Sequence, residues 1–403
     1  MKGLNTKYKA ILRSRKKVLW FSTINALILV LICYFADNLK YSVLSGPSVG
    51  QRIEQFREVS GMTNDIIPDD YVFINIAYDR QLVPVFDEFG LPQGEIDITD
   101  RRKLTSFLNQ LKNTHKYVIV DVLLSDRYKS RSDSILTDAL LKTDKLSISQ
   151  SSTANLIDKR LEGIAGYTDY ASDILETNFV KYQFLKDGSP TMPYMAYLSI
   201  NPRYQMHSFG PVYWSNGHLC WNSLTLRFPI KLWNDPIVDN NSEEVNWQEK
   251  KVLNLGADIL DLDIDIPSLV KDKIVVIGDF TEDDIHDTYI GKVAGPVINI
   301  NALEALRNNE LEIPWTLILF LMLFYTAVTF FTIRQPKVSA NKILTRLHLN
   351  TTFIKYVLSF IGYSFLLYIV GGFIYLFCGI DINIIIPSVW FTFLKGYTNT
   401  FAS

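Results

Sequence analysis

The chain has 403 residues, enough for about two or three compact units, or for one unit together with membrane helices. Its formal net charge at pH 7 is only −2, so no bulk electrostatic attraction to nucleic acid is expected. Apolar residues concentrate at both ends of the chain, while the middle is mixed in character. This distribution indicates membrane segments at both ends of the chain with a large part between them.

The first predicted element is a transmembrane helix over residues 18–36, which carry no charge. About 20 apolar residues cross a bilayer, so the length fits. A basic arm, residues 1–17, precedes this segment, and basic flanks stay in the cytoplasm, so the segment runs outward. A cleavable signal peptide is the alternative interpretation, but the following "CYFADNLKYSV" offers no good cleavage site, which favours an uncleaved anchor.

Three further apolar segments lie near the end of the chain, at residues 313–333, 352–378 and 380–397. The last is short and contains proline, so it is either a fourth span or a re-entrant piece, and we favour a span. The loop 334–351 is basic and has no acid, which places it in the cytoplasm together with the tail 398–403. The prediction is therefore an α-helical transmembrane part of about four helices.

This topology places residues 37–312 outside the cytoplasm. Of the three cysteines, Cys33 and Cys378 lie in apolar spans, and only Cys220 lies in the external part. A single external cysteine forms no internal disulfide, so we expect a hydrophobic core to hold this domain together.

The external part shows the pattern of an α/β domain with a mainly parallel sheet. Runs rich in valine and isoleucine at 71–78, 117–124 and 273–278 are typical of strands covered on both faces. Amphipathic helix patterns follow the first two runs, within residues 100–114 and 130–144. Strand–helix alternation predicts α/β layers. In the middle of the domain, Asn216-Gly217 lies between aromatic and β-branched residues, which predicts an inserted β-hairpin region.

Acidic residues lie near the carboxyl end of each predicted strand or directly after it. Asp79 follows the first, Asp121 lies in the second, and Asp279 begins a cluster after the third that continues with Asp283, Asp284, His286 and Asp287. Parallel strands place their functional loops at the carboxyl ends, so these side chains would share a ligand-binding crevice. The alternative is that the carboxylates cap helix N-termini or are solvated at the surface.

Metal and enzyme chemistry are weakly supported. The stretch "DDIHDT" lacks the central glycine and terminal glutamate of a calcium loop, and the other external histidines lie apart from it. No G-x-S-x-G, P-loop or G-x-G-x-x-G motif occurs. We therefore expect no metal, no cofactor and no enzymatic activity.

A glycine and a proline open the last external helix, residues 295–306, and the second span begins soon after it. A ligand-responsive acidic loop would thus lie one helix away from the membrane. Coupling of the loop to the membrane and simple tethering of the domain are equally compatible with this spacing.

Several motifs occur in an order that resembles the CHASE2 family, the extracytoplasmic sensory domains of bacterial signalling proteins. They are "FINIAYD", "DRRKL", "VDVLLSDRYKSRSDSILTDALL", the strand 273–278 with its following Asp284, His286 and Thr288, and the helix 295–306. The resemblance covers nearly the whole chain. It implies one N-terminal span, an external α/β sensory domain and about three closing spans, and it adds Thr288 to the candidate ligand-binding residues. Where many members carry proline, this chain has Tyr289.

The resemblance implies a multi-pass sensor or receptor subunit of the bacterial inner (cytoplasmic) membrane. Its partners would be the lipid bilayer, an unknown small-molecule or protein ligand, a separate cytoplasmic or membrane effector protein and, as a further option, a second copy of itself, with no nucleic acid. A separate effector is expected because the chain ends shortly after its last predicted span. The alternatives are a scaffold subunit of an envelope complex without a ligand, and an envelope metal-dependent hydrolase.

The predicted topology is tested by reporter fusions. Fusions after Lys16, Arg346 and Ser403 should report the cytoplasm, and a fusion after Trp214 should report the other side of the membrane, because the basic segments remain inside. Alkaline phosphatase and green fluorescent protein activities provide the two complementary signals. A fusion after Trp214 that reports the same side as the one after Lys16 would refute the topology, and an external C-terminus would refute the fourth span alone.

Overall fold

A computed structural model describes residues 14–38, 48–62, 68–87, 89, 91–168, 171–172, 179–232, 252–281, 283–334 and 351–402. The chain divides into two compact units. The first contains Met1–Phe56, Met206–Ser223 and Glu310–Ser403, and the second contains Arg57–Gln205 and Leu224–Asn309. The predicted basic arm before Ser14 and almost all of the predicted basic loop lie outside the described residues.

The first unit contains the apolar helices. Three helices among the described residues are long and apolar enough to cross a membrane, namely α2 (Arg15–Asp37), the part of α11 over Phe353–Cys378, and α9 (Trp315–Arg334). The expected fourth span is not confirmed. The helix α12 (Ile385–Ala402) does cover most of that segment, but it carries Lys395 and several hydroxyl and amide side chains in its second half. The described part of the chain therefore contains three candidate spans.

Polar side chains connect these helices. Asn25 on α2 donates from Nδ2 to Thr329 Oγ1 on α9 at 2.9 Å, and its Oδ1 accepts from Trp390 Nε1 on α12 at 2.9 Å. Asn25 is 5% exposed. Hydrogen bonds between apolar helices stabilise their association because lipid offers these groups no alternative partner.

A small antiparallel sheet also belongs to the first unit. Its strands pair in the order β11 (His207–Phe209), β12 (Val212–Ser215), β13 (His218–Cys220) and β19 (Glu312–Ile313). Asn216 and Gly217, between β12 and β13, have φ angles of 51° and 81°. Because these strands group with the apolar helices rather than with the parallel sheet, a hairpin region inserted into the external domain is not confirmed.

The second unit is built on a six-stranded parallel sheet, which confirms the predicted mainly parallel architecture. The strand order is β15 (Val252–Asn254), β1 (Tyr71–Asn75), β16 (Ile274–Gly278), β4 (Tyr117–Asp121), β5 (Leu146–Gln150) and β6 (Ala165–Tyr167). The strands β1 and β16 are buried along their whole length. Burial on both faces explains why these segments show continuous rather than alternating apolar residues.

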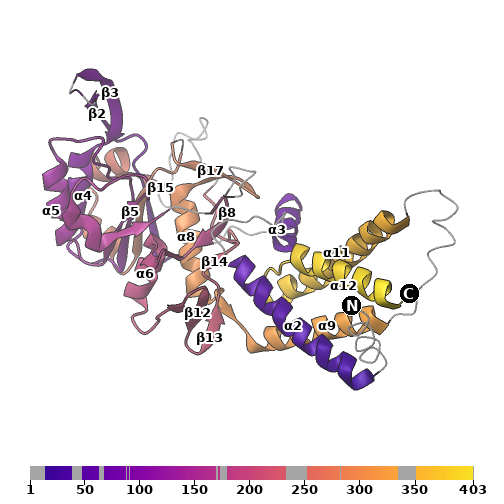
Figure 1. Cartoon of the computed structure of the whole chain (residues 1–403). Helices are drawn as coiled ribbons and strands as arrows, with labels where there is room; N and C mark the ends of the chain where they lie inside the picture. Colours follow the sequence, from indigo (N-terminus) through magenta and orange to yellow (C-terminus); the bar gives the residue numbers. More distant parts are fainter. Residues whose placement is uncertain are drawn as a thin grey trace. The chain divides into compact units, whose positions relative to one another are not determined.

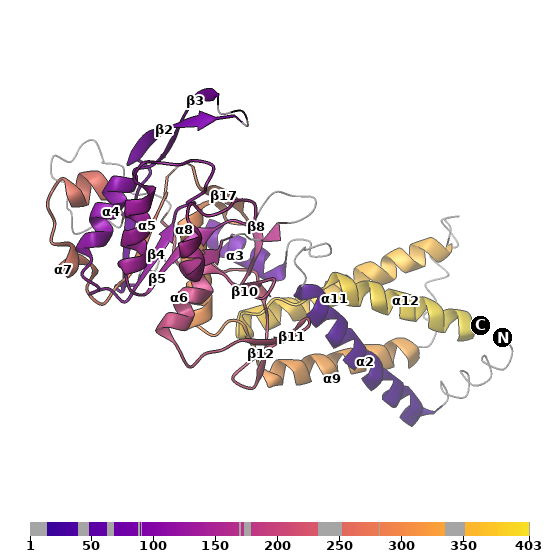
Figure 2. The ribbon, with the colours of Figure 1, turned by 60° about the vertical axis from the view of Figure 1, so that its left-hand side comes forward.

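Helices cover both faces of this sheet. In Figures 1 and 2, α4 (Arg101–Gln110) and α5 (Asp133–Lys142) lie on one side, and α6 (Met192–Ile200) and α8 (Gly295–Arg307) lie on the other. On the α4 side, Leu104, Phe107 and Leu111 are completely buried against alternate residues of the strands. Burying each such side chain contributes roughly 1.5–3 kcal/mol. The Asp100 carboxylate caps α4 by accepting from the amides of Arg102 and Lys103.

The remaining described elements connect these elements along the chain. They are the hairpin strands β2 (Arg80–Phe86) and β3 (Pro92–Thr99), the strands β7 (Ala171–Ser172), β8 (Phe179–Gln183), β9 (Leu185–Lys186), β10 (Ser189–Pro190) and β14 (Ser223–Leu224), the hairpin strands β17 (Ile285–Thr288) and β18 (Gly291–Ala294), the helices α3 (Val49–Val59) and α7 (Ile266–Val270), the 3-10 turn η1 (Lys159–Ile164) and the π-helical turn η2 (Leu255–Leu260). Both hairpins are antiparallel.

The N-terminal end of α8 packs very closely against the sheet at Gly278. A Cβ atom on Gly278 would overlap Pro296 Cγ on α8 and would lie 3.3 Å from Asp121 Cβ. Only a residue without a side chain allows this approach. Eleven of the thirteen residues of α8 are buried, so the helix is enclosed on all sides within the second unit.

Replacing Gly278 tests this close contact. Gly278→Ala should lower the free energy of unfolding of the second unit by about 1–3 kcal/mol, because overpacking moves α8 away from the sheet. Gly163→Ala is the matched control, since a Cβ there meets nothing within 4 Å. Thermal unfolding of the purified full chain, followed by circular dichroism, measures the difference. Equal stability of the two variants would contradict the described packing.

Candidate functional site

A cavity opens at the carboxyl edge of the parallel sheet. The strand register sets Asn75 of β1 beside Gly278 of β16, and Gly278 beside Asp121 of β4, so the three strands end at one level. The cavity beyond this level has a volume of about 770 Å³. Strand ends form its floor, and residues of the β2–β3 and β17–β18 hairpins and of the first turns of α4 and α8 surround it. The sequence-based expectation of a crevice at strand ends matches this location.

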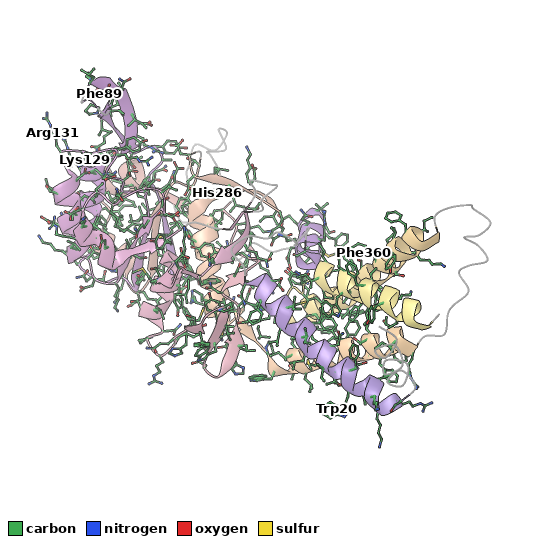
Figure 3. The ribbon with its side chains drawn as sticks, viewed as in Figure 1. Trp20, Phe89, Lys129, Arg131, His286 and Phe360 are labelled. Carbon is green, nitrogen blue, oxygen red and sulfur yellow. The ribbon has the colours of Figure 1, made fainter. Side chains whose placement is uncertain are left out.

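Charged side chains of both signs line the cavity. The acids are Asp97, Asp121, Asp279, Asp283 and Asp284, and the basic groups are Arg80, Arg101 and His286. Figure 3 labels His286, which lies on β17, the strand that with β18 precedes α8. Five of the eight predicted ligand-binding residues are therefore brought together: Asp121, Asp279, Asp283, Asp284 and His286.

Asp121 is held by a side chain of α8. Its Oδ2 accepts a hydrogen bond from Asn299 Nδ2 at 2.7 Å, and Asn299 Oδ1 in turn accepts from the Tyr182 hydroxyl at 2.7 Å. Tyr182 is completely buried. Among the described residues Asp121 has no salt-bridge partner, and the side chains that hydrogen-bond with it, Asn299 and Ser149, are both neutral.

The surroundings of Asp121 disfavour its charged form. Burial and the neighbouring charge of Asp284 raise the pKa of the Asp121 carboxyl from 3.8 to about 7, while the hydrogen bond from Asn299 and the nearby His286 oppose this shift. The same surroundings favour the charged form of His286. Its hydrogen bond with Asp284 raises the pKa of the imidazole, and the charges of Asp284, Asp121 and Asp287 add to this effect against desolvation.

Asp284 occupies a position that depends on a glycine. Its Oδ1 lies 2.9 Å from His286 Nε2, and its backbone oxygen accepts from the amide of Gly295 at 2.7 Å. A Cβ on Gly295 would overlap the Asp284 carboxylate. The first residue of α8 must therefore be glycine for the carboxylate to approach the helix end.

Asp279 and Asp283 are joined by one arginine. Arg80 Nη2 lies 2.7 Å from Asp279 Oδ2 and 2.5 Å from Asp283 Oδ2. Asp279 also accepts from the amide of Thr281 at 2.9 Å. The charges of these two carboxylates are thus balanced in part by Arg80, and Asp284 is paired with His286, which leaves Asp97 and Asp121 as the lining acids without an ion pair among the described residues.

Three predicted site residues lie elsewhere. Asp79 is 4% exposed, and its carboxylate accepts from Lys103 Nζ at 2.6 Å and from the Gly256 amide at 2.9 Å, so it joins α4 to η2. Asp287 is exposed on β17 and is not among the residues that line the cavity. Thr288 Oγ1 donates to the Gly291 oxygen at 2.7 Å and closes the β17–β18 turn. These contacts give Asp79 and Thr288 structural roles, and a ligand role for the three stays a prediction.

The cavity also contains residues that the sequence did not lead us to expect, and Arg101 and Asn299 are two of them. Arg101 is the first residue of α4 and is 2% exposed, yet its Nε and Nη1 have no hydrogen-bond acceptor among the described residues. A cation at a helix N-terminus opposes the helix dipole, and this local inconsistency was the available signal in "DRRKL". Asn299 was signalled by an amide within the otherwise apolar stretch "GPVININALEAL".

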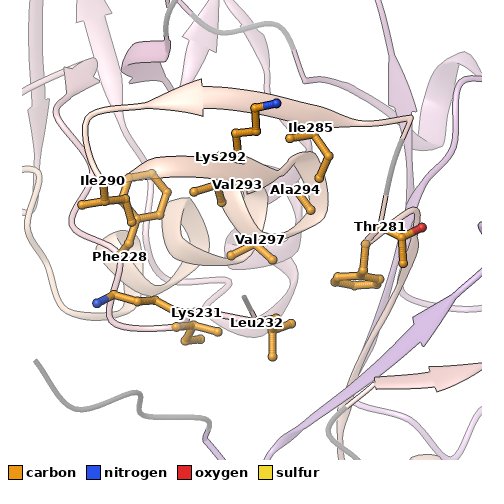
Figure 4. A pocket seen from close by; sticks show the side chains of 12 residues that line it. Phe228, Lys231, Leu232, Thr281, Ile285, Ile290, Lys292, Val293, Ala294 and Val297 are labelled. Carbon is orange, nitrogen blue, oxygen red and sulfur yellow. The ribbon is translucent and has the colours of Figure 1, made fainter. Parts of the chain in front are cut away.

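A second, smaller cavity lies on the other side of the β17–β18 hairpin. Its volume is about 450 Å³, and Figure 4 shows mainly apolar side chains, including Phe228, Ile290 and Val297, around it. Lys231 also lines this cavity and forms an ion pair with Glu58. None of the predicted site residues lines it.

The described residues contain no group of three or more His, Cys, Asp or Glu side chains placed to hold a metal ion. Comparisons of this chain with protein-family models, with curated proteins and with solved structures find no match. The evidence for the chemistry of this site is therefore its geometry, a cavity lined by acids together with Arg80, Arg101 and His286.

The raised pKa of Asp121 makes stability depend on pH. Because the folded state binds this proton more tightly than the unfolded chain does, its contribution to stability is present at low pH and is lost as pH rises from about 4 to about 7. Asp121→Asn removes this dependence. The stability of the variant relative to the wild type should therefore increase by about 3 kcal/mol across that range.

Chemical denaturation at a series of pH values measures this difference. Glu162→Gln, at an exposed carboxylate, is the control and should show a constant difference from the wild type. If the free energy of unfolding of Asp121→Asn relative to the wild type stays constant or falls with pH, the folded state does not disfavour the charged form of Asp121, and the prediction is wrong.

Proposed function

We propose that this protein is a multi-pass membrane receptor whose second unit binds a small polar ligand in the carboxyl-edge cavity. The observation that carries this proposal is the hydrogen bond between Asp121 in the cavity and Asn299 on α8. The helix α8 ends at Arg307, and after residues 308–314 the candidate membrane helix α9 begins at Trp315. A change at the cavity is thus one helix and one short connection away from a candidate span.

The mechanism follows from the charges at the cavity. A ligand that changes the charge state or position of Asp121 changes the strength or length of its hydrogen bond with Asn299. Asn299 lies on α8, which is almost completely buried. Helices that are packed on all sides move as rigid bodies, and shifts of about 1–2 Å are typical of signalling transitions. The ligand can shift this equilibrium only by the difference in its affinity for the two positions of α8.

The similarity to the CHASE2 family supports the same interpretation. A parallel α/β unit followed by apolar helices agrees with the architecture that this resemblance implies. On this proposal the second unit lies outside the bacterial inner membrane, and a separate effector protein receives the signal on the cytoplasmic side. The effector would contact the ends of the membrane helices.

A scaffold role is the second candidate. Phe209 on β11 is 80% exposed, and Trp214 on β12 is 36% exposed. Exposed aromatic side chains on a short sheet are typical anchors for a protein partner. A scaffold would bind such a partner independently of any small molecule, whereas a receptor requires the cavity.

Asp284→Asn separates these functions. The variant should fold, because the backbone hydrogen bond to Gly295 remains, but the response to ligand should be lost, because the carboxylate charge beside Asp121 and His286 is removed. The measurement is hydrogen–deuterium exchange of the full chain in lipid nanodiscs, with and without the small-molecule fraction of an envelope extract. The wild type should gain protection in α8, and the variant should not.

Asp272→Asn is the matched control, since Asp272 is exposed, and an asparagine tolerates its φ of 58°. This variant should respond as the wild type does. If Asp284→Asn unfolds the second unit, the carboxylate is structural and the cavity hypothesis loses its basis. If α8 of the wild type shows no added protection from exchange with any fraction, the result favours the scaffold role.

A further inference from the structure

The cavity contains a buried cation with unmet hydrogen bonds. Arg101 makes one contact with a carboxylate, at 3.5 Å between Nε and Asp133 Oδ1, and that oxygen has no hydrogen-bond partner either. Buried donors without acceptors cost about 1–3 kcal/mol each, and more when the group is charged. The amides of Arg102 and Lys103 at the start of α4 already donate to Asp100, so they are not free to bind an anion. The group on α4 that would bind an anion in the cavity is therefore the Arg101 guanidinium.

The same cavity contains a carboxylate without a cationic partner. Asp121 accepts from Asn299 and experiences the like charge of Asp284. Arg80 is already shared by Asp279 and Asp283, and His286 is paired with Asp284. Two like charges in a partly dry site favour the entry of a positive group between them. The acid side of the cavity therefore accepts a cation, and the Arg101 side accepts an anion.

We infer that the cavity binds a small organic zwitterion, with its ammonium group at Asp121 and Asp284 and its carboxylate at Arg101. This inference rests on the proposed receptor function and specifies its ligand class. A neutral molecule would leave both buried charges unsatisfied, and an ion of one sign would satisfy only one of them. The volume of about 770 Å³ lies within the usual range for small-molecule sites and accommodates an amino acid or a somewhat longer zwitterion.

The test uses the full chain in lipid nanodiscs and isothermal titration calorimetry. The probes are the common L-amino acids and ω-amino acids of increasing chain length. Each probe that binds is compared with its carboxamide, which lacks the anion, and with its N-acetyl derivative, which lacks the cation. At least one zwitterion should bind, and both blocked forms should bind at least about tenfold more weakly, because each loses a charge-assisted hydrogen bond.

Two variants assign the ends of the ligand. In Arg101→Met the parent and its carboxamide should bind equally, while the N-acetyl form remains weaker. In Asp121→Asn the parent and its N-acetyl form should bind equally, while the carboxamide remains weaker. A variant that merely disturbs the fold weakens all probes together. Arg131→Met, at an exposed arginine labelled in Figure 3, should leave every affinity unchanged.

The outcomes separate this inference from the receptor proposal. If blocked forms bind as well as their parents, or if no zwitterion binds the wild type, the zwitterion class is wrong. Protection of α8 by an extract fraction would still support a receptor for another ligand. If a zwitterion binds with the expected selectivity but α8 gains no protection, the ligand class stands and the relay fails.

Discussion

The close approach of α8 to the carboxyl edge of the parallel sheet is the constraint on which the site depends. Gly278 and Gly295 permit it, because a side chain at either position would overlap Pro296 or Asp284. This approach brings Asn299 within hydrogen-bond distance of Asp121. Without these glycines the helix would stand further from the sheet, and the cavity would lose its connection to the segment that precedes α9.

The cavity combines opposite charges that are not paired with one another. Arg80 balances Asp279 and Asp283, and such pairs stabilise a site without requiring a ligand. Arg101 and Asp121 differ, because Arg101 is buried, Asp121 is partly buried, and neither has a full ionic partner among the described residues. Proteins keep buried charges of this kind at a cost in stability, and functional sites are where that cost is usually tolerated.

The helix α8 is unusual in being enclosed on every face while carrying two asparagines. Asn299 contacts the cavity, whereas Asn301 bonds the backbone of Ile230 in both directions, with its Nδ2 donating at 2.9 Å and its Oδ1 accepting at 3.1 Å. At the other end of the helix, Arg307 lies 2.7 Å from Glu304 and 2.9 Å from Asp70. Specific polar contacts along the whole helix therefore define its position.

Local patterns in the sequence predicted three of the six parallel strands (β1, β4 and β16), the helices α4, α5 and α8, and the three apolar segments that form candidate spans, because hydrophobic period and length are properties of short segments. They also indicated that acids gather after the strands. The tertiary structure alone decided which acids line a common cavity. Asp79 accepts hydrogen bonds from Lys103 and Gly256 away from the cavity, whereas Asp121 lines the cavity and accepts from Asn299. Strand order, helix approach and the burial of Arg101 arise from contacts between residues far apart in the chain, and no local pattern encodes those distances.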